Sequence, residues 1–312
     1  MAPIELANEH IVVRLDPERG ATIDHLGVTG AAIDNVLAHY DWKSPLPARL
    51  GPGYGSSTAD WLSEYRGGWQ LLTPSGGAES IFNGVVRPFH GEVSRARWTV
   101  VSNSVDAATL TTGTHGPLEV SRTLRLDATR SSVVVKTTIK NGSPVPAHAI
   151  LIEHIAFAGG DNSRVFAPSR TKWRYDPSSP EGKNNDRILD WADSGIASPV
   201  SRGKYRLASL LSESEGWVEL HNGSRSSPTV RIEWDPRVLP YLWHWQERGS
   251  ECFPWYGRAD ITALEPSSVS FSDGLLAAVD RGEAWFVGPG EERSVEVSVG
   301  LIPFREEKGT AA

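Results

Sequence analysis

Residues 118–139 have the sequence LEVSRTLRLDATRSSVVVKTTI, and this stretch decides the fold class. Apolar and polar residues alternate over Leu118–Leu126, and Ser132–Ile139 is rich in β-branched residues. Alternation with a period of two is typical of a strand that buries one face. The short polar run between the two segments predicts a turn. We therefore expect two neighbouring antiparallel strands here.

The same pattern continues along the chain on both sides. Turn-forming pairs such as Asn141-Gly142 and Asn222-Gly223 separate the segments, and no long amphipathic helix interrupts them. Many short strands without intervening helices predict an all-β protein, built as a large antiparallel sandwich or barrel. The other expected strands are His10–Leu15, Arg97–Val101, Ala108–Thr112, Ala147–Ile155, Trp217–His221, Thr229–Trp234, Ile261–Leu264, Leu276–Val279, Ala284–Val287 and Ser294–Leu301.

Two segments break the strand pattern. Ser44–Gly55 is rich in Pro and Gly, and Pro168–Ser201 is long and polar. Segments of this kind inside a compact domain are usually active-site loops or surface excursions. Strand patterns flank both segments without a change in composition, so neither is expected to be a linker. Residues 1–312 are predicted to form one domain with an ordered core over about 4–304.

Composition and charge exclude several classes of partner. The chain has 31 basic and 38 acidic residues, a net charge of -7 and a pI near 5.7, which argues against nucleic acid or an anionic membrane. It has no run of 18 apolar residues, and its first residues lack the pattern of a secretory signal. A single cysteine, Cys252, excludes an internal disulfide and a cysteine-cluster zinc site. We expect a cytoplasmic monomer or homodimer that acts on a small molecule.

Common catalytic motifs are absent from the sequence. The nine histidines show no H-x-x-x-H spacing, and there is no G-x-S-x-G elbow, P-loop or dinucleotide fingerprint. Metal, hydrolase, kinase and dehydrogenase functions therefore have no motif to support them. Twelve tryptophans are unusual, and an indole can stack on the apolar face of a sugar ring. Most individual tryptophans are nevertheless expected to fill a sheet core.

Four local clusters stand out against the strand background. A histidine in a strand is often structural, and a glutamate before proline often marks only the end of a strand, so each cluster alone means little. Their order and spacing together carry the information. The clusters are YRGGWQLLTP (65–74), RPFHGE (87–92), NGSPVP (141–146) followed by EHIAF (153–157), and WYGRAD (255–260) followed by LEP (264–266).

This order of clusters resembles the aldose 1-epimerase (galactose mutarotase-like) superfamily over about residues 10–301. The R-G-G-W…P and H-G-x-x…W arrangement is similar to the hexose-6-phosphate mutarotase branch and to related uncharacterised aldose epimerase-like proteins. The resemblance implies a galactose mutarotase-like β-supersandwich of large antiparallel sheets. It also implies a carbohydrate cleft across one concave sheet face.

The resemblance further implies roles for individual residues. The N-x-S-x-x-P segment and the strand after it are similar to the part that carries the family's acid, here His154, and the late strand carries its base, here Glu265. Arg66 and His90 would bind sugar oxygens. The phosphosugar branch continues H-G-F-A-R, whereas Ser94 stands here at the place of its phosphate-binding arginine, which disfavours a 6-phosphosugar. The family's aspartate between the two motifs is assigned to no position.

Further substrate contacts are expected from aromatic and polar residues near these motifs. In residues 241–246 (YLWHWQ), His244 and Gln246 share one face and the two tryptophans share the other. Either face can line the cleft, and we favour the polar one. The residues just before the Glu265 strand are expected at its rim. On these grounds the predicted contacts are Trp69, His244, Gln246, Trp255 and Tyr256.

The chemistry fits these residue types. Interconversion of the α and β anomers requires a proton to leave the C1 hydroxyl and another to reach the ring oxygen, which one carboxylate and one imidazole can achieve. No cofactor and no metal are required. We expect an ionised Glu265, a protonated His154 and a bell-shaped pH profile. Glu153 should point to the opposite face of its strand, and we do not nominate it.

The leading hypothesis is an isomerase of the aldose 1-epimerase (mutarotase) type that acts on an aldose or a modified aldose. One alternative is a carbohydrate-binding protein without turnover. Another is a different sugar-active enzyme on the same fold, such as a lyase or a glycosidase-associated domain, because a fold alone does not determine function. The identity of the sugar is left open.

Overall fold

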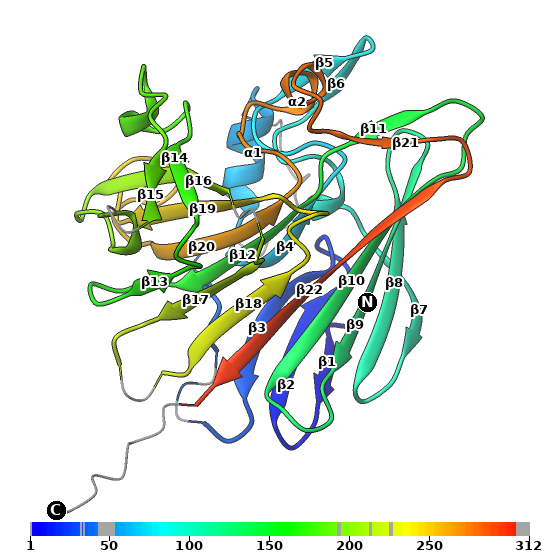
Figure 1. The fold of residues 1–312 in the computed structure, drawn as a ribbon. Helices are drawn as coiled ribbons and strands as arrows, with labels where there is room; N and C mark the ends of the chain where they lie inside the picture. The colour runs from blue at the N-terminus through cyan, green and yellow to red at the C-terminus, as the bar shows by residue number, and fades with distance from the viewer. Residues whose placement is uncertain are drawn as a thin grey trace, which may run out of the picture.

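The computed structural model describes residues 2–31, 33, 35–42, 54–191, 195–211, 214–224 and 227–303. Two large antiparallel sheets pack against each other (Figure 1). A cluster of buried apolar residues from both sheets fills the space between them. This arrangement confirms the all-β prediction. No helix in the described part of the chain is long and apolar enough to cross a membrane.

The first sheet has ten strands in the order β1-β2-β3-β4-β12-β20-β19-β16-β14-β15. Its central strands come from distant parts of the chain, because β4 pairs with β12 and β12 pairs with β20. The strands are β1 (Ile4–Ala7), β2 (Ile11–Asp16), β3 (Thr22–Val28), β4 (Gly68–Leu72), β12 (Ile152–Ala158), β14 (Lys172–Tyr175), β15 (Leu189–Asp190), β16 (Lys204–Leu211), β19 (Tyr241–Arg248) and β20 (Asp260–Ser267).

The second sheet has eight strands in the order β13-β17-β18-β22-β10-β9-β8-β7. Its strands are β7 (Thr99–Asn103), β8 (Ala107–Gly113), β9 (Leu118–Leu126), β10 (Ser132–Asn141), β13 (Arg164–Phe166), β17 (Trp217–His221), β18 (Thr229–Trp234) and β22 (Glu292–Ile302). Two small pairs complete the strands, namely β5 (Ser80–Phe82) with β6 (Val85–Arg87) and β11 (Ala147–Ala149) with β21 (Trp285–Val287). The helices are α1 (Ser57–Glu64), α2 (Leu275–Asp280) and the 3-10 turns η1 (Val93–Arg95), η2 (Pro180–Gly182) and η4 (Gly195–Ala197).

Residues 118–139, whose alternating pattern predicted the fold class, form the central strands β9 and β10 of the second sheet. Val135 on β10 lies opposite Leu124 on β9 and opposite Val297 on β22, and all three side chains are fully buried. Every second residue of these strands turns toward the first sheet, as the period of two predicted. The bounds of β9, β17 and β18 coincide with the predicted strands.

A charged pair is buried between the two sheets. Arg122 on β9 donates from Nη2 to the carboxylate of Glu153 on β12 over 2.8 Å, and both side chains are 0% exposed. Trp69 and Thr137 each donate a further hydrogen bond of 2.6 Å to the same carboxylate. Glu153 therefore points into the interior and away from the outer face of its strand, as expected.

Several predictions about secondary structure are wrong. Residues 276–279 lie in the helix α2, because a short apolar run does not by itself distinguish a strand from a helix. Pro168–Ser201 contains β14, β15 and two 3-10 turns, so it is not structureless. The expected strand Ala147–Ile155 is divided between β11 and β12. Residues 44–53 of the segment Ser44–Gly55 lie outside the described residues.

Candidate active site

A row of side chains crosses the outer face of the ten-stranded sheet, the face away from the eight-stranded sheet. Gln70 on β4 is in register with His154 on β12, and Glu265 on β20 is in register with Trp243 on β19. The two middle members meet, because Nε2 of His154 lies 3.7 Å from Oε1 of Glu265. The predicted acid and base therefore stand side by side on neighbouring strands, and we call them the pair.

An aromatic roof encloses the pair. The ring centre of His154 lies 5.4 Å from that of Tyr65, 5.8 Å from His90, 5.9 Å from Trp61 and 6.0 Å from Trp245. These four residues define the roof. The side chains of the pair are only 3% and 2% exposed. In this conformation the site is closed to solvent.

Helix α1 supplies one side of the roof. Trp61 lies on the helix and stacks on Tyr65, four residues later, with ring centres 4.6 Å apart. The indole N–H of Trp61 donates to the hydroxyl of Ser94 on η1 over 3.2 Å, and Glu64 forms an ion pair with Arg95 on the same turn. The short turn after His90 therefore fixes the position of α1 over the sheet.

Several polar atoms of the site are buried and have no hydrogen-bond partner among the described residues. They are Nδ1 of His154, Oε2 of Glu265, the hydroxyl of Tyr65 and Oε1 of Gln70. Buried polar groups are almost always hydrogen-bonded, so a cluster of exceptions needs an explanation. Ligand hydroxyl groups would satisfy all four atoms.

Burial sets the protonation of the pair. It lowers the pKa of His154 to about 4 and raises the pKa of Glu265 well above its usual value. Burial also lowers the pKa of His90, whose Nδ1 accepts the backbone N–H of Gly77 over 3.1 Å. At neutral pH the imidazole is thus neutral, and the carboxyl group keeps its proton to a higher pH than an exposed glutamate does. Burial therefore disfavours the expected state, an ionised Glu265 with a protonated His154, because it removes the solvation that both charges need.

A cavity of about 640 Å³ lies against the roof on the side of β2, β3 and β4. Its lining includes Trp61, Tyr65 and Gln70, which also lie beside His154. These three residues therefore lie between the cavity and the pair. Arg66 also lines this cavity, and its guanidinium lies 3.5 Å from Asp41. The structure therefore places Arg66 at the cavity and His90 at the pair.

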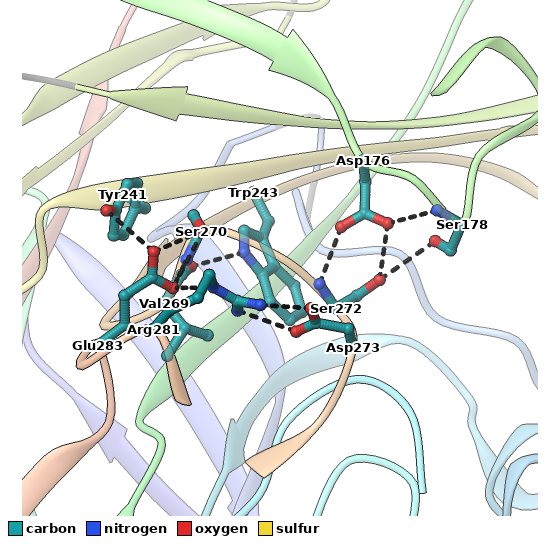
Figure 2. Close-up of polar contacts among 10 residues, drawn as sticks. All are labelled: Asp176, Ser178, Tyr241, Trp243, Val269, Ser270, Ser272, Asp273, Arg281 and Glu283. Carbon is teal, nitrogen blue, oxygen red and sulfur yellow. Dashed lines mark hydrogen bonds and ion pairs between the residues drawn. The ribbon is translucent and has the colours of Figure 1, made fainter. Parts of the chain in front are cut away.

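On the other side of the pair, Trp243 on β19 is in register with Glu265. Its indole N–H donates to the carbonyl of Val269 over 2.9 Å and so holds the segment that follows β20, as Figure 2 shows. Further along the segment, Ser270 donates hydrogen bonds from its backbone N–H and its hydroxyl to the carboxylate of Glu283. The backbone N–H of Ser272 donates to the carboxylate of Asp176, which follows β14. Because these contacts hold the segment in place, the cavity side is the natural entry to the pair.

Three predicted substrate contacts point away from this face. His244 and Gln246 lie on the interior face of β19, where both are buried and Gln246 accepts a hydrogen bond of 2.7 Å from Arg206. The aromatic face of β19 points to the site instead, with Trp245 in the roof. Trp69 is also interior and donates to the core carboxylate. These assignments are wrong, because alternation separates two faces without identifying the inner one.

The remaining predicted contacts lie differently. Trp255 packs on Tyr65 and Trp245, with ring centres 6.0 and 5.8 Å away, and so adjoins the roof. Tyr256 is 62% exposed and contacts Phe253 rather than the roof.

Four residues of the site are not among the contacts predicted from the sequence, namely Trp61, Tyr65, Gln70 and Trp245. Gln70 was accessible to sequence reasoning, since it alternates with the interior Trp69 in the first cluster. The role of α1 was not, because its eight residues carry no long apolar stripe.

Among the described residues, no group of three or more His, Cys, Asp or Glu side chains is arranged to hold a metal ion. Cys252 is a free, exposed thiol.

Comparison with known proteins adds to this geometry. A family model described as "Domain of unknown function (DUF4432)" matches residues 3–301, and no curated protein matches the sequence. The chain is similar to the solved structure of the Slr1438 protein from Synechocystis sp., with 16% identity, a TM-score of 0.70 and coverage of 97% of this chain and 96% of that one.

Two further solved structures give the same result. A putative aldose 1-epimerase from Klebsiella pneumoniae shows 15% identity and a TM-score of 0.71 over 95% of this chain and 77% of that one. A galactose mutarotase-like protein from Lactobacillus casei shows 16% identity and a TM-score of 0.65 over 96% of this chain and 100% of that one. At these identities the likeness establishes the fold, and it confirms the galactose mutarotase-like β-supersandwich.

Proposed function

The chain belongs to the DUF4432 family and has a galactose mutarotase-like fold, and from this premise we propose that it is an aldose 1-epimerase. The observation that carries the proposal is the pair, an imidazole and a carboxylate 3.7 Å apart on neighbouring strands. Four buried polar atoms without partners around it support a ligand rich in hydroxyl groups. Among the described residues, one carboxylate lies at the centre of the site, whereas most glycosidases use two.

The proposed reaction needs one proton in the pair. Glu265, protonated in the closed site, gives its proton to the ring oxygen while neutral His154 takes the proton of the C1 hydroxyl. The bond between C1 and the ring oxygen breaks, and the open chain carries a free aldehyde. Rotation about the C1–C2 bond exposes the other face, and ring closure returns both protons to their starting places.

These roles are the reverse of those implied by the family resemblance. The reversal follows from burial, which favours the neutral form of both groups. Ring closure is the chemical reverse of ring opening, so each group acts once as donor and once as acceptor in a full cycle. The same two residues therefore suffice in either direction, and the cycle requires no cofactor.

The surroundings of the pair are proposed to bind the sugar. Gln70, His90 and the hydroxyl of Tyr65 would hydrogen-bond to its hydroxyl groups, and Trp245 offers an aromatic surface for its apolar face. Arg66 would act from the cavity side. Because the roof covers the pair, α1 and Tyr65 have to move to admit the substrate and return to exclude water.

Replacement of either member of the pair tests the proposal. We expect Glu265→Gln and His154→Gln to lower anomer exchange, measured by NMR saturation transfer, at least about 100-fold, as general acid–base groups contribute about 10²–10⁴-fold. Glu119→Gln makes the same chemical change at an exposed site on β9 and serves as the control. Exchange at the native rate in a folded Glu265→Gln protein would exclude the assignment.

The pH profile tests the protonation of the pair. The active form holds one proton, so the rate should form a bell whose acid limb lies near pH 4, where His154 takes up a second proton. The alkaline limb should lie well above the ordinary pKa of a glutamate, where Glu265 loses its proton. An acid limb near pH 6.5, the value of an unburied histidine, would contradict this protonation scheme.

The closed roof also favours a second candidate, a carbohydrate-binding protein without turnover. Calorimetric binding of a sugar without any enhancement of anomer exchange would support this alternative over the enzyme.

A further inference from the structure

We propose that the cavity beside the roof binds a second, uncharged sugar ring, so that the substrate is a reducing disaccharide or a longer oligosaccharide. The inference rests on the proposed function, because it takes the reducing end of the sugar to lie at the pair. It adds the size and the charge of the substrate, which the pair itself does not define.

The register of the sheet gives the distance that a substrate must span. Asp16 on β2 is opposite Thr22 on β3, Gln70 donates to the hydroxyl of Thr22 over 3.4 Å, and Gln70 is in register with His154. Strands lie about 4.8 Å apart, so Thr22 is about 10 Å and Asp16 about 14 Å from the strand of His154. A sugar ring whose C1 lies at the pair would cover Gln70 on β4. Beyond Gln70, the row of side chains continues across β3 and β2.

The cavity follows this row to its end. Asp16, Thr22 and Gln70 all line it, together with residues of α1 and η1 on its other wall. Its volume of about 640 Å³ is within the range of sites for ligands larger than one small ring. A monosaccharide with its reducing end at the pair would leave most of this volume to water.

The charges of the cavity are balanced. Four arginines and four carboxylates line it, and each arginine has a carboxylate partner within 4 Å. The pairs are Arg19–Asp16 at 3.8 Å, Arg66–Asp41 at 3.5 Å, Arg95–Glu64 at 2.5 Å and Arg97–Glu18 at 2.7 Å. A phosphate, carboxylate or sulfonate would have to displace one of these partners and would leave it unpaired beside the new anion.

A neutral polyol has no such cost. Guanidinium groups only donate hydrogen bonds and carboxylates only accept them, so each ion pair presents both functions to a hydroxyl group. Partly exposed ion pairs contribute little to stability, so both partners can turn toward a neutral ligand and still remain close to each other. The buried Oε1 of Gln70, without a partner among the described residues, lies where the two rings would join.

Arg19→Ala tests the subsite at the far end of the cavity. We expect kcat/KM for reducing disaccharides such as maltose, cellobiose and lactose to fall about tenfold, mainly through KM, with the rate for glucose and galactose unchanged. Native protein should act faster on at least one disaccharide than on the monosaccharides, and poorly on glucose 6-phosphate. Anomer exchange by NMR saturation transfer provides all of these rates.

Arg130→Ala is the matched control. Arg130 pairs with Asp127 at 3.8 Å and with the same three-residue spacing as Arg19 and Asp16, but it lies between β9 and β10 and does not line the cavity. The proposal is overturned if Arg19→Ala affects monosaccharides and disaccharides equally, if no disaccharide exceeds the monosaccharides, or if the 6-phosphate is the best substrate.

Binding separates failure of the subsite from failure of the enzyme proposal. If no sugar shows enhanced exchange, calorimetry on the Glu265→Gln protein measures the same panel of sugars. Disaccharide binding that is tighter than monosaccharide binding and weakened by Arg19→Ala supports the subsite, even though the epimerase proposal fails. Absence of this preference overturns the subsite by itself.

Discussion

Arg122→Met removes one partner of the ion pair between Arg122 and Glu153, which is buried between the two sheets, and keeps a side chain of similar length. Arg122 and Glu153 are both 0% exposed. After the change, the carboxylate of Glu153 keeps its bonds from Trp69 and Thr137 but loses the one ion-pair partner that it has among the described residues. The variant therefore buries a charge without compensation, directly beside His154 in the sequence of β12.

The expected loss follows from this burial. Breaking a fully buried ion pair by removing one partner costs about 3–5 kcal/mol, a large share of the about 5–15 kcal/mol that stabilises a typical domain.

Urea unfolding followed by tryptophan fluorescence gives the free energy of unfolding of the variant and the native protein. The double variant Arg122→Met with Glu153→Gln should recover at least about 2 kcal/mol of the loss, since the remaining amide carries no charge and its oxygen still accepts one of the two hydrogen bonds. A loss below about 1 kcal/mol would refute the account of a buried ion pair.

Three further predictions concern other parts of the molecule. Burial lowers the pKa of His244 to about 3, below that of a histidine in the unfolded chain. Between pH 7.5 and pH 5 the unfolded chain therefore takes up a proton here that the folded state does not, which lowers the free energy of unfolding by about 2 kcal/mol. His244→Asn should remove this part of the acid destabilisation, as measured by urea unfolding across this pH range. Gly20 has a φ of +67° and a Cβ there would lie 2.1 Å from a carbonyl oxygen, so Gly20→Ala should lower the melting temperature more than Gly30→Ala, which has φ +72° and open space. Trp245→Ala should weaken sugar binding in calorimetry, whereas Trp69→Phe should leave binding unchanged and cost about 2 kcal/mol of stability for its lost hydrogen bond to the buried carboxylate of Glu153.

The second sheet was predictable from local sequence. On β9, β17 and β18 one face is buried and the other is more exposed, so apolar and polar residues alternate and their bounds follow from the pattern. On β4 and β12 nearly every residue is buried, and the alternation disappears. These strands form the middle of the ten-stranded sheet, and their pairing joins segments about 80 residues apart, which no local pattern records.

The site was predictable only in part, for a related reason. Family order nominated His154 and Glu265, and the structure brings their side chains together. The row that contains them requires the registers of β3, β4, β12 and β20, which become known only once the sheet is assembled. Protonation was inaccessible for the same reason, because the roof that removes the pair from water comes from distant segments.

The orientation of β19 has a consequence for how a sugar is held. The preference for a polar face in the cleft assumed that one face of the strand meets water, but both faces of β19 are covered, one by the second sheet and one by the roof and Val269. Gln246 can lie in the interior because Arg206 donates a hydrogen bond to its side-chain oxygen. Trp243 and Trp245, on the other face of the strand, therefore point to the site. The wall beside Glu265 is thus aromatic and can offer stacking but few hydrogen bonds. Recognition of hydroxyl groups must come from the opposite side, where Gln70 and the cavity with its paired charges lie. A sugar is therefore expected to meet an apolar wall on the β19 side of the pair and polar groups along its length toward β2.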